Sequence, residues 1–151
     1  MQREEWSGLS RRAASAADRD WARAVHHAAL REVVERQFGV WDEPLQDRFF
    51  ACEWVAAPFE VVAWDGRPCG YVCVEDRPGD VHLRELVIAP DHQNRGIGTA
   101  IVEDAIERAR RRRVPVVLQA LHQNRAIALY RRLGFVPTGR TTTHTRFRRD
   151  T

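Results

Sequence analysis

The chain has 151 residues, of which 44% are hydrophobic and 30% are charged, and its formal net charge is +3. This length predicts one domain, residues 1–151, with a sizeable buried core. No apolar run approaches the ~20 residues of a membrane span, and the N-terminus has no apolar signal region, so we expect a cytoplasmic protein. A charge of +3 is too small to favour nucleic acid as the main partner.

The side-chain inventory removes several kinds of chemistry. All 24 basic residues are arginine, so a lysine nucleophile and a lysine Schiff base are excluded. The cysteines Cys52, Cys69 and Cys73 form no CxxC pair and have no histidine partner at metal-binding spacing. We therefore expect buried free thiols and no metal site.

The N-terminal part predicts a short strand over 9–14 and then a helix. Ser15, with Asp18 three residues later, is typical of a capping box at the start of a helix. Gly39 ends this helix. The expected buried face of this helix consists of apolar residues that recur at four-residue steps, Trp21, Val25, Ala29 and Val33, with Leu30, Val34 and Phe38 beside them.

A second helix and three strands follow. Asp42 is the expected N-cap of a helix that reaches about Ala51. Asp65-Gly66 and Pro78-Gly79-Asp80 are turn signals between strand-like runs, so the strands are expected to be antiparallel. These runs cover residues 59–64, 69–75 and 81–88.

A glycine-containing loop comes next, with the sequence Gln93-Asn94-Arg95-Gly96-Ile97-Gly98. An amphipathic helix grows from it, with Ile97, Ile101, Ala105 and Ala109 on one side. Such a loop at a helix N-terminus presents unpaired N–H groups and the positive end of the helix dipole. This arrangement favours the binding of phosphate, here the pyrophosphate of a nucleotide-type cofactor.

The remaining chain alternates strands and helices. The run Arg110–Arg113 ends the amphipathic helix, where cations suit the dipole. A strand is predicted over 114–120, and a short helix over 125–133 is capped by Asn124. A hairpin over 135–143 and 145–148 completes an α/β fold with a mixed sheet.

The glycine loop does not match the two commonest nucleotide motifs. The third glycine of G-x-G-x-x-G is missing, because Ile101 stands there, and no acidic strand end for ribose follows about twenty residues on. A P-loop needs a lysine, and the chain has none.

Two segments resemble another family. Gln93-x-x-Gly96-x-Gly98 is similar to the pyrophosphate loop of the GCN5-related N-acetyltransferases, the GNAT family. About thirty residues later, Asn124-x-Ala126-x-x-Leu129-Tyr130-x-x-Leu133-Gly134-Phe135 resembles the second signature of that family. The resemblance covers about residues 81–139, and the Trp41-Asp42-Glu43 segment is similar to a bacterial subgroup.

The resemblance implies a GNAT-like mixed, mostly antiparallel sheet of six to seven strands flanked by about four helices. It also implies acetyl-CoA as the donor of an acetyl group to a primary amine of a small molecule or peptide. By the family pattern, backbone of the entering strand pairs with pantetheine and the loop backbone binds the pyrophosphate. The implied donor-binding residues are Leu86, Val87, Ile88, Gln93, Asn94, Arg95, Gly96, Ile97, Gly98, Thr99, Asn124, Ala126 and Tyr130.

The resemblance also gives Tyr130 the role of acid at the departing thiol, although an aromatic on a buried helix face is the structural alternative. The base that deprotonates the amine is either His82 or Glu85 on the strand before the loop. Strand alternation places these two side chains on opposite faces unless a bulge resets the parity. His144 and His122 are less favoured alternatives, and His26 and His27 are expected at the surface.

The acceptor pocket is expected between the first two helices and the last hairpin. The resemblance suggests Glu35, Trp41 and Glu43, with Trp54, as lining residues, each of which could instead be structural. Two other functions stay open: an acyl-CoA sensor without turnover, and an RNA- or ribosome-associated protein that uses Arg110–Arg113. The sequence also leaves open whether the protein forms a homodimer.

Overall fold

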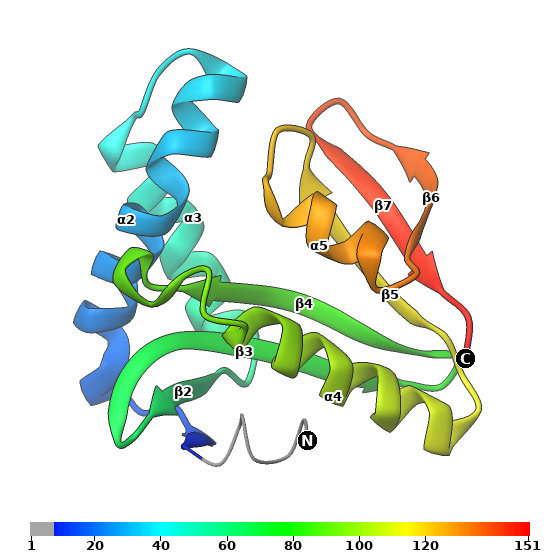
Figure 1. The fold of residues 1–151 in the computed structure, drawn as a ribbon. Helices are drawn as coiled ribbons and strands as arrows, with labels where there is room; N and C mark the ends of the chain where they lie inside the picture. The colour runs from blue at the N-terminus through cyan, green and yellow to red at the C-terminus, as the bar shows by residue number, and fades with distance from the viewer. Residues whose placement is uncertain (1–7) are drawn as a thin grey trace.

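The computed structural model describes residues 8–151 (Figure 1). Residues 1–7, which carry part of the argument against a signal region, lie outside this range. The strands are β1 Leu9–Ala13, β2 Glu60–Trp64, β3 Arg67–Arg77, β4 Asp80–Ile88, β5 Val116–Leu121, β6 Val136–Arg140 and β7 His144–Arg149. The helices are α2 Arg19–Phe38, α3 Glu43–Ala56, α4 Ile97–Arg112 and α5 Ala126–Arg132, with short 3-10 segments at Ala16–Asp18 and Pro90–His92.

The strands form one sheet in the order β1-β2-β3-β4-β5-β7-β6. Neighbouring strands are antiparallel except β4 and β5, which are parallel. Within residues 8–151, the predicted mixed, mostly antiparallel sheet with four α-helices is therefore confirmed. None of the helices in that range combines the length and apolarity that crossing a membrane requires.

The first helix follows its local sequence signals. Ser15 and Asp18 form the predicted capping box at the 3-10 turn that precedes α2. Gly39 ends α2 with a φ of 82°, a left-handed conformation that glycine adopts without strain. Both predicted ends of this helix are thus confirmed to within a few residues.

The second helix starts as predicted but ends later. The side chain of Asp42 accepts a hydrogen bond from the backbone N–H of Leu45 at 3.1 Å, which caps α3. The predicted end near Ala51 is wrong, since α3 continues to Ala56. No helix breaker occurs in the sequence until Pro58.

Two apolar cores lie on opposite faces of the sheet. One lies under α4 and α5, and it includes the predicted face Ile97, Ile101, Ala105 and Ala109 together with Val72 and Leu83. Figure 1 shows α4 crossing β3 and β4 on this side. The other lies under α2 and α3 and includes Ala22, Val25, Phe50, Phe59 and Tyr71.

Only two of the three cysteines match the prediction of buried thiols. Cys69 and Cys73 on β3 are free and buried. Cys52 on α3 is free but exposed, so the prediction is wrong for this residue. The buried pair is inert packing, since burial is the largest cause that raises the pKa of the Cys73 thiol, to about 11.

A bulge resets the alternation of side chains along β4. Cys73 of β3 pairs with Glu85, but Val74 pairs with Leu83, so Arg84 is the additional residue on β4. The bulge moves Glu85 to the face that His82 occupies, and Leu86 to the face under α4. The parity that the sequence left open is thus decided in favour of a shared face for His82 and Glu85.

The strands β4 and β5 separate after a short contact. Their parallel pairing covers only Val81 with Val116 and His82 with Val117. Yet β4 continues to Ile88 and β5 to Leu121, and Figure 1 shows the two strands diverging. The part of β4 beyond the contact therefore has one backbone edge that is not paired with β5.

Gly70 provides a test of how tightly β3 packs on the end of β4. A Cβ at Gly70 would lie 2.3 Å from the backbone oxygen of Val87, a contact that requires β3 and β4 to move apart. We expect Gly70→Ala to lower the free energy of unfolding by about 1–3 kcal/mol. Urea unfolding measures this, with Gly79→Ala as the control because a Cβ there meets nothing within 4 Å. Equal unfolding midpoints for the two variants would contradict the predicted close contact.

Candidate active site

The gap between β4 and β5 opens into a cavity of about 870 Å³. Residues 82–86 of β4 line it, α2 and α3 form one wall, and β5, α5 and the turn before β7 form the other. Gln37 at the end of α2 joins the two walls. Its side chain donates to the backbone oxygen of Thr143 at 2.8 Å and accepts from the backbone N–H of Gln123 at 3.0 Å.

Glu85 lines this cavity from β4. Its carboxylate makes no hydrogen bond or ion pair to another residue in the described range 8–151. Burial raises the pKa of Glu85 to about 7, the nearby Glu53 carboxylate adds to the rise, and Arg84 opposes it. An unpaired carboxyl group with a pKa near neutrality can both accept and return a proton at physiological pH.

Tyr130 lines the same cavity from α5. Its ring is 7% exposed and packs against Phe135 and Phe147, with ring centroids 5.9 Å and 6.3 Å away. Burial raises the pKa of Tyr130 to about 12, and the Glu85 carboxylate contributes to the rise. The phenol is therefore protonated at neutral pH and able to donate. The structure thus gives this residue a packing role and a place in the lining of the cavity.

His82, the other candidate base, also lines the cavity but is bonded on one side. Its Nδ1 donates to Glu75 at 3.0 Å. Arg84 donates to Glu53 at 3.1 Å and to the second oxygen of Glu75 at 3.5 Å. Glu75 and Glu53 thus accept hydrogen bonds from His82 and Arg84. The Glu85 carboxylate takes no part in these contacts.

Asn124 has a structural bond as well as a place in the cavity. Its side-chain oxygen accepts from the backbone N–H of Ala126 at 2.9 Å, at the start of α5, which begins one residue later than predicted and has Arg125 at its N-cap position. Leu86 also lines the cavity, whereas Val87 and Ile88 do not. Val87 packs in the core under α2 and α3, and Ile88 packs against the core under α4.

The glycine loop lies beyond the end of β4 and does not line the cavity. Gly96 has a φ of 82° and precedes the first residue of α4, and Asn94 also has a positive φ, of 61°. The side chain of Gln93 donates to the backbone oxygen of Ile88 at 2.9 Å, which ties the loop to the strand. The first turn of α4 contains no acidic residue. The positive end of the helix is thus left available to an anion.

The acceptor residues suggested by the sequence lie outside the cavity, except Trp54, which lines it. Glu35 accepts from Arg31 at 2.9 Å on the outer side of α2. Trp41 donates to Glu43, and its ring meets that of His27 at 5.1 Å.

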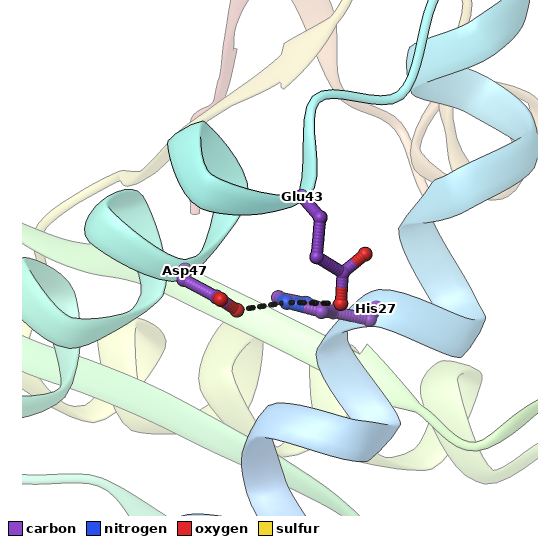
Figure 2. Close-up of side chains that lie close together, drawn as sticks. All are labelled: His27, Glu43 and Asp47. Carbon is purple, nitrogen blue, oxygen red and sulfur yellow. Dashed lines mark hydrogen bonds and ion pairs between the residues drawn. The ribbon is translucent and has the colours of Figure 1, made fainter.

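Glu43 belongs to a cluster with His27 and Asp47, which point toward one another between α2 and α3 (Figure 2). Their ligand atoms lie within 4.8 Å of one another. Arg23 already contacts both carboxylates, at 2.6 Å to Asp47 and 3.2 Å to Glu43. We therefore interpret the cluster as an ion-pair network around Arg23 that orients His27.

His26 is a cavity residue that the sequence reasoning missed. The prediction of a surface position was wrong for both histidines, because His26 is only 8% exposed and lines the cavity, and the side chain of His27 is only 11% exposed. Its Nδ1 lies 2.9 Å from Nδ1 of His27, whose Nε2 lies 2.7 Å from Asp47. Burial lowers the pKa of His26 to about 4, and the nearby His27 adds to the fall, so His26 is neutral at pH 7.

The sequence contains a pattern that could have predicted the position of His26. Ala22, His26, Leu30, Val34 and Phe38 recur at four-residue steps, so they share one side of α2. Glu53 was missed for another reason, because the predicted end of the second helix excluded it. Of the less favoured histidines, His144 lines the cavity. His122 does not, and both its ring nitrogens contact Thr145 or Thr141.

The run Arg110–Arg113 is partly engaged within the chain. Arg110 and Arg111 approach Glu107 at 2.6 Å and 3.8 Å. Arg112 approaches Asp76 at 3.1 Å and donates to two backbone oxygens. Within the run, Arg112 thus joins α4 to the β3–β4 turn, whereas Arg110 and Arg111 contact their own helix.

Residues 14–135 match the model of the Acetyltransferase (GNAT) family, so the chain belongs to this family. An uncharacterised N-acetyltransferase of Methanocaldococcus jannaschii is 35% identical over 92 residues. That match covers 60% of this chain but only 39% of the relative's length.

Solved structures share the fold at lower identity. The PaiA N-acetyltransferase of Thermoplasma acidophilum, in complex with coenzyme A, has a TM-score of 0.77 and 13% identity, and the match covers 95% of this chain and 99% of that one. The yncA protein of Salmonella typhimurium, with its cofactor acetyl-CoA, has a TM-score of 0.58 and 22% identity over 95% and 94% of the two chains. At these identities the likeness shows the fold.

The raised pKa of Glu85 predicts how stability depends on pH. Between its ordinary value of 4.5 and about 7, the folded protein holds this proton more often than the unfolded chain does. The contribution of Glu85 to the unfolding free energy is therefore present below pH 4.5 and is lost as pH rises to about 7. Urea unfolding of the wild type and of Glu85→Gln at a series of pH values measures this. We expect the wild type to lose stability relative to the variant by about 1–3 kcal/mol across the window. A difference that is independent of pH would contradict the assignment.

Proposed function

We propose that the protein transfers an acetyl group from acetyl-CoA to a primary amine by direct attack in a ternary complex. The observation that carries the proposal is the juxtaposition of Glu85 and Tyr130 in one cavity, beside the open edge of β4 that leads to the glycine loop. Membership of the GNAT family supports the same reaction.

The residues present fit the proposed donor. An extended pantetheine arm can pair with the backbone of Leu86, Val87 and Ile88, because this edge of β4 is not paired with β5. Backbone N–H groups of residues 93–99 can bind the pyrophosphate at the start of α4. Asn124 and Tyr130 reach the cavity from α5 and the turn before it. The coenzyme A and acetyl-CoA held by structural neighbours support this assignment.

Glu85 is the proposed base. A free alkyl amine carries a proton at neutral pH and must lose it before it can attack. The Glu85 carboxyl, with a pKa of about 7, can accept that proton directly or through a water molecule. His82 is the alternative base, and its bond to Glu75 would orient it. Glu85 is favoured over His82 as the base because its carboxylate has no hydrogen-bond or ion-pair partner among the described residues.

Tyr130 is the proposed acid. Acetyl-CoA supplies the acetyl group as a thioester, and the amine nitrogen replaces the sulfur at the carbonyl carbon. Backbone N–H groups near Val87 and Ile88 can stabilise the negative charge that develops on the carbonyl oxygen. Tyr130 donates its proton to the departing sulfur and is reprotonated by the proton that the nitrogen releases. The balanced products are an N-acetyl amine and free coenzyme A.

A thiol-release assay with acetyl-CoA and a panel of amines tests this function. We expect amine-dependent release, and we expect Tyr130→Phe to lower kcat by about 10²–10⁴-fold with little change in KM for acetyl-CoA. Coenzyme A binding without thiol release from any amine would instead indicate a sensor. Unchanged turnover by Tyr130→Phe would remove Tyr130 from the mechanism.

Gly96→Asp tests the phosphate loop. The substitution adds a negative charge at the start of α4, and it places a side chain on a residue with a positive φ, which strains the backbone. We therefore expect coenzyme A to bind at least about tenfold more weakly. Calorimetric titration with coenzyme A measures the affinity. Gly66→Asp is the matched control, since Gly66 also has a positive φ, of 78°, and lies in the β2–β3 turn. Equal affinities for the two variants would contradict the loop assignment.

A further inference from the structure

The end of the cavity formed by α2 and α3 is apolar. Six side chains line it there: Leu30, Val34, Phe38, Val40, Leu45 and Phe49. Phe38, Val40 and Phe49, which we call the apolar rim, are 48%, 62% and 53% exposed. A cluster of large exposed apolar side chains at the mouth of a cavity indicates contact with a ligand or partner.

The helices hold these side chains apart. Leu30, Val34 and Phe38 stand on successive turns of one side of α2, and Leu45 and Phe49 do the same on α3. Gln37, next to Phe38, is bonded to Gln123 and to Thr143 on the opposite wall. These two hydrogen bonds tie the end of α2 to the opposite wall of the cavity.

Charge is distributed unequally between the two ends of the cavity. The carboxylates of Glu53 and Glu85 lie at the inner end, where Glu53 is paired with Arg84. At the outer end, Asp42 is the only acidic residue among the described lining residues, and its carboxylate caps the backbone N–H of Leu45. The cavity thus offers one unpaired carboxylate to a cation, at the inner end.

We propose that the acceptor is a monoamine with an apolar body, whose amino group reaches Glu85 while its hydrocarbon or aromatic part extends toward the apolar rim and packs against Phe49. The inference rests on the proposed acetyltransferase function. A polyamine would place a second cation against the apolar side chains of the rim, where the one lining carboxylate, that of Asp42, already caps the backbone N–H of Leu45. A short hydroxylated amine would leave the rim exposed.

Amine selectivity tests the proposal. Thiol release is measured with 2-phenylethylamine, with ethanolamine and with the diamine putrescine. Burial of a phenyl ring against the rim predicts a kcat/KM for phenylethylamine that is about 10- to 100-fold higher than for the other two. Equal or lower values for phenylethylamine would overturn the proposal, while the release itself would leave the proposed function standing.

A pair of variants on α3 assigns the selectivity to the rim. Phe49→Asp is expected to lower kcat/KM for phenylethylamine at least about tenfold, with little effect on ethanolamine or on KM for acetyl-CoA. Val55→Asp is the control, because Val55 is 83% exposed on the same helix and does not line the cavity. Equal effects of the two variants would overturn the proposal.

The oligomeric state provides the last check, because a second copy of the chain could cover the same apolar surface. Light scattering of the wild type and of Phe49→Asp measures the mass in solution. We expect the same mass for both proteins. A wild-type dimer that Phe49→Asp dissociates, with unchanged amine selectivity, would show that the rim is an interface and would overturn the proposal.

Discussion

The separation of β4 from β5 is the constraint on which the site depends. The two strands pair in parallel only at Val81–Val116 and His82–Val117, and then diverge. The divergence leaves one edge of β4 without a neighbouring strand and opens the cavity that Glu85 and Tyr130 share. The α4 helix begins beyond the end of the same strand, with its positive end free of acidic side chains. One irregularity of the sheet therefore provides both a free strand edge and a cavity, and the positive end of α4 lies beyond the end of that strand.

Electrostatics within the cavity separates the candidate groups. Arg84 donates hydrogen bonds to Glu53 and Glu75, and Glu75 also accepts one from His82. The charges of Glu53 and Glu75 are therefore compensated by these partners. Glu85 has no such partner, and its burial near Glu53 brings its pKa to about 7. The charge of Glu85 also contributes to the raised pKa of Tyr130, which keeps the phenol protonated. A proton acceptor and a proton donor are thus produced in one cavity by burial and by the bulge at Arg84.

The acceptor side of the cavity was the least predictable part of the site. Tyr130 and Asn124 were named from the second signature, and both line the cavity. His26, Glu53 and the apolar rim required knowledge of how α2 and α3 pack, because no local motif marks them. Glu35, Trp41 and Glu43 were suggested from the resemblance alone. The structure places them in contacts with Arg31, His27 and Arg23 outside the cavity.

The sequence by itself determined the local elements: the capping box at Ser15, the glycine at the end of α2, the hairpin turns and the apolar face of α4. These features depend on residues a few positions apart, so their physics can be read along the chain. It also determined the family, through two short signatures. Only the tertiary structure decided that Glu85 shares a face with His82, because the bulge depends on how β3 registers against β4. It also decided which side chains line the cavity, since helices and strands distant in sequence form its walls together.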